Sequence, residues 1–256
     1  VASDQSNHAS IIDGIRLARA DKSILTHGSH DHEPGTRLVV HEGIYSMNGD
    51  ILDLSKIAAS VRKSGAWWMI DEAHAVGVLG PDGRGAAAAA GVEPDFLVGT
   101  LGKAFGAFGA FVIGPPELRE LLISRGRSFI FTTGLPEAAA SAALVALRLA
   151  DDARRERLLN RVRRLRDGLD SRGFESLGHH HIVPIVLGTR TMRMAQRLRQ
   201  RGYWVPGIRA PTVPPGTERL RITVSAEHSD SQIDGLLEAL DEARSHIDIS
   251  DPSHNR

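Results

Sequence analysis

Short apolar runs alternate with helical patterns in the first half of the chain. Four runs stop abruptly at polar or glycine residues, as buried strands do: 38–40, 67–70, 96–98 and 110–113. Apolar residues three or four apart predict a helix from Leu52 to Val61, which Gly65 ends. The isoleucines and leucine between 11 and 17 predict a shorter amphipathic helix. This order of strands and helices is typical of an α/β fold.

The second half begins with a long helical pattern from 137 to 169, rich first in alanine and then in arginine. Its apolar residues fall on one stripe: Leu144, Leu147, Leu149, Leu158, Val162 and Leu165. The mixed charges of 151–157 suit a solvated helix surface, because opposite charges at these spacings pair. The pattern then predicts a strand at 182–187, a helix at 191–201, strands between 203 and 225 and a helix at 230–244. We therefore expect a large domain over 1–140, followed by a bridging helix and a smaller domain over 141–256.

The composition excludes some classes of function. The 256 residues are 41% hydrophobic, enough for one large or two smaller domains. The 31 basic and 31 acidic residues balance, so we expect no nucleic-acid or anionic-membrane partner. There is no cysteine, hence no disulfide framework or thiol nucleophile. The sequence shows no signal peptide and no apolar run long enough to span a bilayer, which favours a cytoplasmic enzyme.

Chemically versatile side chains follow two of the predicted strands. Asp71 and His74 come at the end of one strand, and Thr100 and Lys103 at the end of another. Ligands of open α/β sheets bind beyond the carboxyl ends of the strands, so these side chains can converge on one pocket. A lysine amine can form a Schiff base with an aldehyde, and a carboxylate can keep a pyridine nitrogen protonated. The set therefore suits pyridoxal phosphate (PLP), although singly Lys103 and Asp71 are more simply a surface lysine and a turn residue.

Glycine-rich motifs surround these residues. Residues 71–77 read D-E-A-H-A-V-G, 80–85 read G-P-D-G-R-G, and 99–106 read G-T-L-G-K-A-F-G, followed by F-G-A at 108–110. With these motifs the sequence closely resembles the α-oxoamine synthases, from His8 to about Leu240. These are aspartate aminotransferase-like PLP enzymes of fold type I, which condense an amino acid with an acyl-CoA and release CoA and carbon dioxide. The resemblance implies a large PLP-binding domain with a mainly parallel sheet and a smaller α/β domain at the C-terminus.

The resemblance also implies roles for single residues around the cofactor. Lys103 would form the Schiff base and act as general base, and Asp71 would pair with the pyridine nitrogen. His8, in D-Q-S-N-H-A-S, would stack over the ring. His74 and Ser46, the latter in E-G-I-Y-S-M-N-G-D, would reach the phenolic oxygen of the cofactor.

Three threonines have phosphate roles by the same resemblance. Thr100 would contact the phosphate in its own subunit. Thr132 and Thr133 match the segment that reaches the phosphate of the neighbouring subunit. The resemblance therefore implies a homodimer with shared active sites.

Residues 207–222 resemble the substrate-binding segment of the family. Arg209 matches the arginine that binds the amino-acid carboxylate, to which a planar guanidinium can donate two parallel hydrogen bonds. Thr212 matches a substrate-contacting threonine, and Ala210 departs from the family, where a second proline is usual. The run is most similar to members that join L-alanine to a pimeloyl thioester in biotin biosynthesis. Members that use glycine share the cofactor site and stay an alternative.

Two other kinds of site fit the sequence less well. The H-G-S-H-D-H run at 27–32 offers metal ligands in kind, but Ser29 stands where an H-x-H-x-D-H signature needs its second histidine. The histidines at 179–181 form too short a run to indicate a metal site. A nucleotide-binding P-loop around Lys103 would need glycine at Leu97 and serine or threonine at Ala104. We therefore expect neither a metal nor a nucleotide.

The sequence starts at Val1 within the pattern of the family. We therefore expect the first part of the family's large domain, with part of the cofactor cradle, to be absent from this chain. A non-catalytic fragment that keeps the fold without the reaction is a second hypothesis. The presence of Asp71, His74, Lys103 and Arg209 argues against it.

Overall fold

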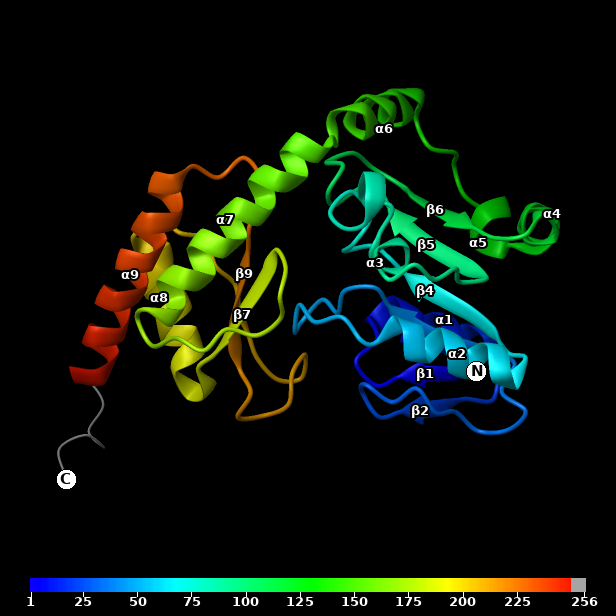
Figure 1. The fold of residues 1–256 in the computed structure, drawn as a ribbon, viewed down its shortest axis with the longest axis horizontal. Helices are drawn as coiled ribbons and strands as arrows, with labels where there is room; N and C mark the ends of the chain where they lie inside the picture. Colours follow the sequence, from blue (N-terminus) through cyan, green and yellow to red (C-terminus); the bar gives the residue numbers. More distant parts are fainter. Residues whose placement is uncertain (250–256) are drawn as a thin grey trace. The chain divides into compact units, whose positions relative to one another are not determined.

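The computed structural model of the chain describes residues 1–249 (Figure 1). By their internal contacts these residues form two compact units. Unit 1 consists of residues 1–45 and 51–155, and unit 2 of residues 46–50 and 156 onward. The division falls after Arg155, whereas the sequence placed a domain boundary at 140. The short segment 46–50 belongs to unit 2 although its neighbours on both sides belong to unit 1.

Unit 1 is built on a six-stranded sheet with the order β2-β1-β3-β4-β5-β6. Neighbouring strands are parallel except β6, which runs antiparallel to β5 at the edge. The strands are β1 (Ala2–Asp4), β2 (Ser23–Leu25), β3 (Leu38–Glu42), β4 (Trp67–Asp71), β5 (Phe96–Thr100) and β6 (Ala110–Ile113). The four strands expected from the apolar runs are present, and the mainly parallel sheet is confirmed.

The helices of unit 1 connect these strands. They are α1 (Ala9–Ala18), α2 (Leu54–Ser64), the 3₁₀ turn η1 (Pro81–Gly83), α3 (Ala86–Ala89), α4 (Pro116–Arg125), α5 (Arg127–Ile130) and α6 (Glu137–Leu149). Helix α2 begins where the Asp53 side chain accepts the backbone N–H of Lys56, and it ends at Gly65 in the left-handed conformation. The sequence therefore predicted the end of this helix correctly and its start two residues early.

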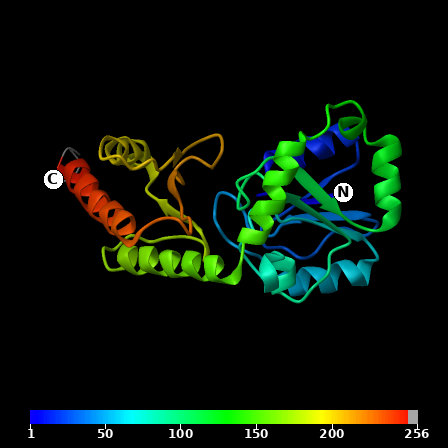
Figure 2. The same ribbon diagram turned by 90° about the horizontal axis from the view of Figure 1, so that it is seen from above.

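Helices cover both faces of this sheet (Figure 2). Ile11 and Ile15 of α1 pack with Val40, next to Leu38 and Met69. Residues alternate between the faces of a strand, so Val39 and Trp68, both almost fully buried, face the opposite side, which α2 covers. These two layers of apolar side chains form the core of unit 1 and hold the strand ends in place.

Unit 2 has a three-stranded antiparallel sheet with the order β7-β9-β8. Its elements are β7 (Ile182–Val186), the 3₁₀ turn η2 (Gly188–Arg190), α8 (Thr191–Gln200), β8 (Gly207–Ile208), β9 (Arg219–Thr223) and α9 (Asp230–Ile249). Helix α7 (Asp152–Asp170) begins four residues before the boundary, and its residues from Glu156 onward belong to unit 2. The strands expected between 203 and 225 are shorter than predicted, because 209–218 form a loop rich in proline and glycine.

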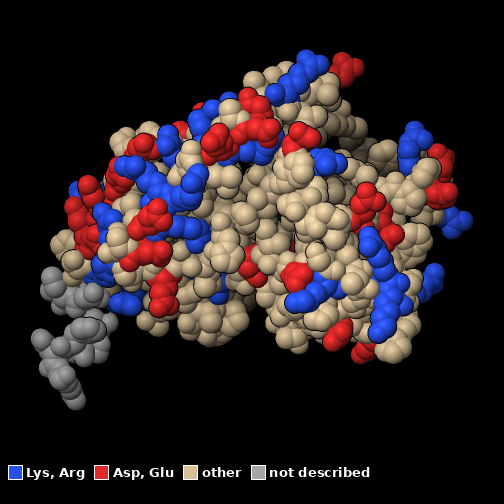
Figure 3. All heavy atoms as spheres, in the orientation of Figure 1, with Lys and Arg blue, Asp and Glu red and all other residues tan. Residues whose placement is uncertain are grey.

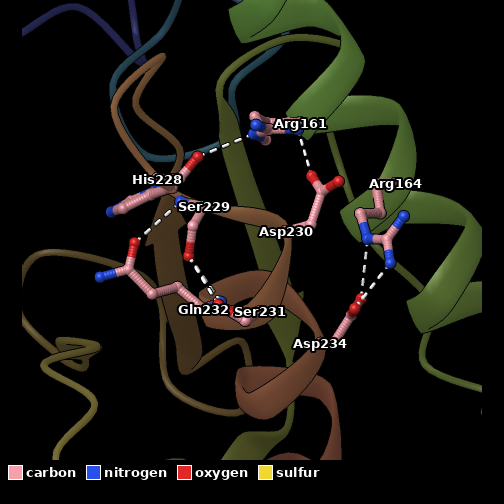
Figure 4. Close-up of polar contacts among 8 residues, drawn as sticks. All are labelled: Arg161, Arg164, His228, Ser229, Asp230, Ser231, Gln232 and Asp234. Carbon is pink, nitrogen blue, oxygen red and sulfur yellow. Dashed lines mark hydrogen bonds and ion pairs between the residues drawn. The ribbon is translucent and has the colours of Figure 1, made fainter.

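Polar contacts fasten α9 to α7 (Figure 4). Arg164 donates two hydrogen bonds to Asp234, at 2.7 and 2.6 Å. Arg161 donates to the backbone oxygen of His228 at 2.7 Å and to the Asp230 carboxylate. The first turn of α9 carries a capping box, in which Ser229 and Gln232 exchange side chain to backbone hydrogen bonds.

The apolar stripe predicted over 137–169 is divided between two helices. On α7, the stripe residues Leu158, Val162 and Leu165 are buried. On α6, Leu144 and Leu147 are 58% and 60% exposed, so this part of the stripe is not covered within the described residues. Ala143 is the buried residue of α6. Within residues 1–249, no helix is both long and apolar enough to cross a membrane.

Candidate active site

The parallel strands of unit 1 end at a common edge. Strands β3 and β4 pair with Glu42 opposite Asp71, and β4 and β5 pair with Asp71 opposite Val98. Thr100 is the last residue of β5, and Lys103 lies in the loop that follows. Asp71, Thr100 and Lys103 therefore come from the carboxyl ends of neighbouring strands, as expected from the sequence, and this is where ligands bind in open α/β sheets.

His8 is attached to the same edge through Glu42. It is the N-cap of α1, where its ring nitrogen Nδ1 accepts the backbone N–H of Ser10 at 3.3 Å. Its own backbone N–H donates to Glu42 Oε1. Since Glu42 is buried and His8 is exposed, the strand end holds the backbone of His8 and leaves the ring accessible. The sequence did not single out Glu42, although the residue lies in the E-G-I-Y-S motif.

Asp71 and His74 occupy a tight turn after β4. Asp71 Oδ1 accepts the backbone N–H of Ala73 at 2.9 Å, and the backbone oxygen of Glu72 accepts the N–H groups of Ala75 and Val76. Asp71 and His74 are both half-buried. The turn therefore fixes the Asp71 carboxylate through one oxygen at the edge of the sheet.

A buried carboxylate, that of Glu72, supports this turn. It accepts the backbone N–H groups of Ala86 and Ala87 at 2.9 and 2.8 Å, at the start of α3. The Glu72 carboxylate fits here because Gly43 has no side chain. A Cβ on Gly43 would lie 2.1 Å from Glu72 Oε2. Burial raises the pKa of Glu72. The sequence analysis did not predict this role of Glu72. The available signal is that Glu72 is a second acidic residue, directly after Asp71, at the end of an apolar strand.

Lys103 lies on a loop closed by its own hydrogen bonds. Thr100 Oγ1 donates to the Gly109 oxygen at 3.1 Å and accepts the Gly102 N–H at 3.2 Å. The N–H of Leu101 also donates to the Gly109 oxygen, at 2.9 Å. The loop thus leaves and re-enters the sheet between β5 and β6 and exposes Lys103.

Gly77 brings the turn after β4 against the Lys103 loop. A Cβ on Gly77 would lie 3.0 Å from the Cβ of Ala104 and 3.2 Å from the ring of Phe105. Gly77 also has a φ of 80°, which side chains disfavour. The two segments that carry His74 and Lys103 therefore pack directly on each other.

The other predicted residues of unit 1 are the threonines after α5. Thr132 and Thr133 lie between α5 and α6, and both are exposed. Their position on the surface of unit 1 is compatible with a contact outside the chain. Their role at the phosphate of a second subunit stays a prediction.

Ser46 belongs to unit 2, where it is buried. Its backbone oxygen accepts the Nε–H of Arg221 at 2.6 Å. Ser46 thus lies on a segment that β9 holds. Its side chain is placed by unit 2, whereas Asp71 and Lys103 are placed by unit 1.

Arg209 and Thr212 share one turn after β8. The N–H of Thr212 donates to the Arg209 oxygen at 3.0 Å, and the Ala210–Pro211 peptide bond between them is cis. Both side chains are exposed. The turn therefore presents a guanidinium and a hydroxyl from neighbouring positions, as a carboxylate site requires.

Two of the histidines in 27–32, His27 and His32, make contacts within the chain. His27 Nδ1 lies 2.9 Å from Asp4 Oδ1, and the ring of His27 packs edge-on against Tyr45. His32 Nε2 lies 2.7 Å from Ser64 Oγ. In the described part of the chain, no three His, Asp or Glu side chains are placed to hold a metal ion.

Comparison with known proteins agrees with this geometry. Residues 1–240 match the family Aminotransferase class I and II. The chain belongs to this family. Among curated members of the aminotransferase class I and II family, the putative 8-amino-7-oxononanoate synthase of Desulforudis audaxviator is 45% identical over 254 residues, which cover 94% of this chain and 66% of that protein. The chain thus spans just under two thirds of the length of this relative.

Solved structures of the family have the same fold. Serine palmitoyltransferase from S. paucimobilis, with a bound PLP–myriocin adduct, is 34% identical to this chain, with a TM-score of 0.90. The match covers 97% of this chain and 67% of the palmitoyltransferase chain. 8-Amino-7-oxononanoate synthase from Francisella tularensis is 30% identical over 96% of this chain and 75% of its own, with a TM-score of 0.83. The α/β fold of type I expected from the sequence, and the resemblance to the α-oxoamine synthases, are confirmed.

Proposed function

We propose that this chain takes part in a PLP-dependent condensation of an amino acid with an acyl thioester. The observation that carries the proposal is the pairing of β4 with β5, which places Asp71 and the Lys103 loop at adjacent strand ends. The amino acid is L-alanine and the acyl donor a pimeloyl thioester, as in the 8-amino-7-oxononanoate synthases of biotin biosynthesis. Identities of 41–46% to curated proteins of that name support this choice.

The side chains at the strand ends fit PLP. A half-buried carboxylate at the end of β4 suits a protonated pyridine nitrogen, and an exposed lysine amine on a glycine-rich loop suits an aldehyde. Because Gly77 has no side chain, the turn after Asp71 can pack against Ala104, the residue next to Lys103. The carboxylate and the amine therefore lie on adjoining segments. When bound, the cofactor supplies an electron sink for the carbanion at the substrate Cα.

Each residue of unit 1 then has a defined task. Lys103 would hold the cofactor aldehyde through its Nζ, and its amine would serve as the base for the proton on the substrate Cα. Asp71 would pair with the pyridine nitrogen and favour its protonated form. His8 and His74 orient the ring, His8 from the start of α1 and His74 from the turn that Glu72 supports, and Thr100 binds the phosphate.

The residues of unit 2 serve the substrate and the phenolic oxygen. Arg209 binds the carboxylate of the amino acid with two parallel hydrogen bonds, which a lysine could not donate. Thr212 fixes its orientation from the same turn. Ser46 contacts the phenolic oxygen of the cofactor.

A homodimer is part of this proposal. Thr132 and Thr133 of one subunit would bind the phosphate held by the other, and their exposure supports this. On the face shown in Figure 3 basic and acidic side chains are interspersed, in keeping with equal totals of 31 and 31. The absence of nucleic-acid and membrane partners, and a cytoplasmic location, stay predictions.

The absorption spectrum of the chain after PLP addition and dialysis tests this proposal. We expect a retained visible band that shifts with L-alanine and not with glycine, and release of CoA on addition of pimeloyl-CoA. A shift with glycine alone would favour the glycine-using alternative. The lack of any retained band would contradict the proposal and favour the non-catalytic hypothesis.

A further inference from the structure

The segment 46–50 folds with unit 2, although it is inserted between residues of unit 1. It begins with Ser46, to which the proposed function gives a contact with the cofactor. The contacts that fix this segment therefore decide where Ser46 lies. Two arginines of strand β9 donate side-chain hydrogen bonds to residues 46–48.

Two arginines of β9 point to the segment. Residues alternate between the faces of a strand, so Arg219 and Arg221 share one face. Leu220 and Ile222 occupy the other face and are buried. The alternation R-L-R-I thus gives β9 one apolar face for the core of unit 2 and one cationic face.

The cationic face binds the backbone and side chains of 46–48. Arg221 Nε donates to the Ser46 oxygen at 2.6 Å. Arg219 Nη1 donates to Asn48 Oδ1 and, at 3.4 Å, to the Met47 oxygen, while its Nε donates to the Thr217 oxygen at 3.0 Å. One guanidinium therefore joins the segment to the loop before β9.

Arg221 is half-buried, and Arg219 is shielded further from water. Arg219 is only 6% exposed. Burial lowers the pKa of both guanidinium groups. A buried cation is costly unless hydrogen bonds satisfy it, so each lost acceptor leaves a donor unpaired.

Close backbone contacts hold the other end of the segment. A Cβ on Gly49 would lie 2.4 Å from the Ile182 oxygen, and one on Gly178 would lie 2.5 Å from the Gly49 oxygen. The N–H of His179 donates to the same Gly49 oxygen at 3.4 Å. The segment is therefore fixed at both ends within unit 2.

We propose that Arg219, together with Arg221, is a positioning residue that fixes the segment 46–50 and thereby presents Ser46 to the cofactor. The inference rests on the proposed function, in which Ser46 contacts the cofactor. Arg219 itself acts through Asn48 and Met47.

The test compares Arg219→Lys and Asn48→Ala with the wild-type chain. A lysine cannot donate to Thr217, Asn48 and Met47 from one planar group, and alanine removes the side-chain acceptor while it leaves Arg219 in place. In the chain without cofactor, we expect hydrogen exchange of the backbone amides of 47–50 to be at least about tenfold faster in both variants, since hydrogen bonds to charged groups contribute this much. The amides of β7 should exchange at the wild-type rate. The dissociation constant for PLP should rise by about tenfold in parallel.

The control is Arg201→Lys, which alters an exposed ion pair with Glu242 in the same unit. It should leave both readouts unchanged. The double variant Arg219→Lys/Asn48→Ala should exchange no faster than the stronger single variant, because the two residues share one contact.

Unchanged exchange at 47–50 in both variants would overturn the inference, and so would faster exchange without any loss of PLP affinity. A general rise in exchange that includes β7 would show a merely structural role and would also overturn it. If the wild-type chain binds no PLP, the proposed function fails, and the exchange data alone decide whether Arg219 fixes the segment.

Discussion

The carboxylate of Glu42 accepts the backbone N–H of His8, and Glu42 lies opposite Asp71 in the paired strands β3 and β4. One buried acid thus connects the start of α1 to the edge that carries Asp71.

Glu42→Ala should lower the free energy of unfolding by about 2 kcal/mol, because it removes a hydrogen bond to a charged group. It should also weaken PLP binding, since His8 loses its anchor. Glu42→Gln keeps an acceptor and should lose less in both urea unfolding and PLP titration. Equal stability of all three proteins would refute this link.

Gly77 offers a test of the contact between the His74 turn and the Lys103 loop. Gly77→Ala introduces a Cβ at a φ of 80° and 3.0 Å from the Cβ of Ala104, so it should destabilise the protein by about 2 kcal/mol and displace the loop. Gly65→Ala is the matched control, because Gly65 has a φ of 73° but nothing within 4 Å of an added Cβ. It should cost only about 1 kcal/mol and leave PLP affinity intact. A Gly77→Ala protein with wild-type PLP affinity would show that the loop does not depend on this contact.

We expect the protein to lose stability in mild acid because of the buried His41 of β3. It is fully buried, and burial lowers its pKa from 6.5 to about 4, near Asp4 and His27. The unfolded chain takes up a proton as the pH falls below about 6.5, whereas folded His41 stays neutral until about pH 4. The stability that depends on neutral His41 is therefore fully present above pH 6.5. As the pH falls to about 4, the free energy of unfolding drops by roughly 3 kcal/mol on account of this residue.

The comparison of wild-type and His41→Phe proteins isolates this effect. Urea unfolding at pH 7.5 and pH 5 should show the stability of the wild type falling relative to the variant at the lower pH. Titrating groups that do not interact with His41 cancel in this difference. Parallel loss of stability in both proteins would contradict the assignment to His41.

The sequence predicted the parts of the site that follow long apolar strands. The run 67–70 places Asp71, and the run 96–98 places Thr100 and Lys103, because a strand of five residues has a clear pattern and a definite end. Strands β1 and β2 were missed, since three residues each carry too little pattern. The strand ends were therefore predictable where the strand itself was.

The residues that hold the site were not predictable in the same way. Glu42 and Glu72 are buried acids, and sequence patterns place acidic residues on the surface. Each acid is buried because it accepts a backbone N–H from a segment that is distant in the sequence. Glu72 also needs the space left by Gly43. A helical or strand pattern in the sequence shows none of these contacts. The segment 46–50 folds with unit 2 and contacts Arg219, a residue far along the chain.

In the proposed function, Lys103 binds the aldehyde of PLP. Borohydride reduction of the chain with PLP, followed by proteolysis and mass spectrometry, tests it directly, because reduction makes the carbon–nitrogen bond permanent. We expect one pyridoxyl group on the peptide that contains Lys103, none on that peptide in Lys103→Ala, and an unchanged adduct in the surface control Lys63→Ala. Lys103→Ala should fold with wild-type stability within about 0.5 kcal/mol, since the side chain is exposed. An adduct on another lysine, or none in the wild type, would contradict the account.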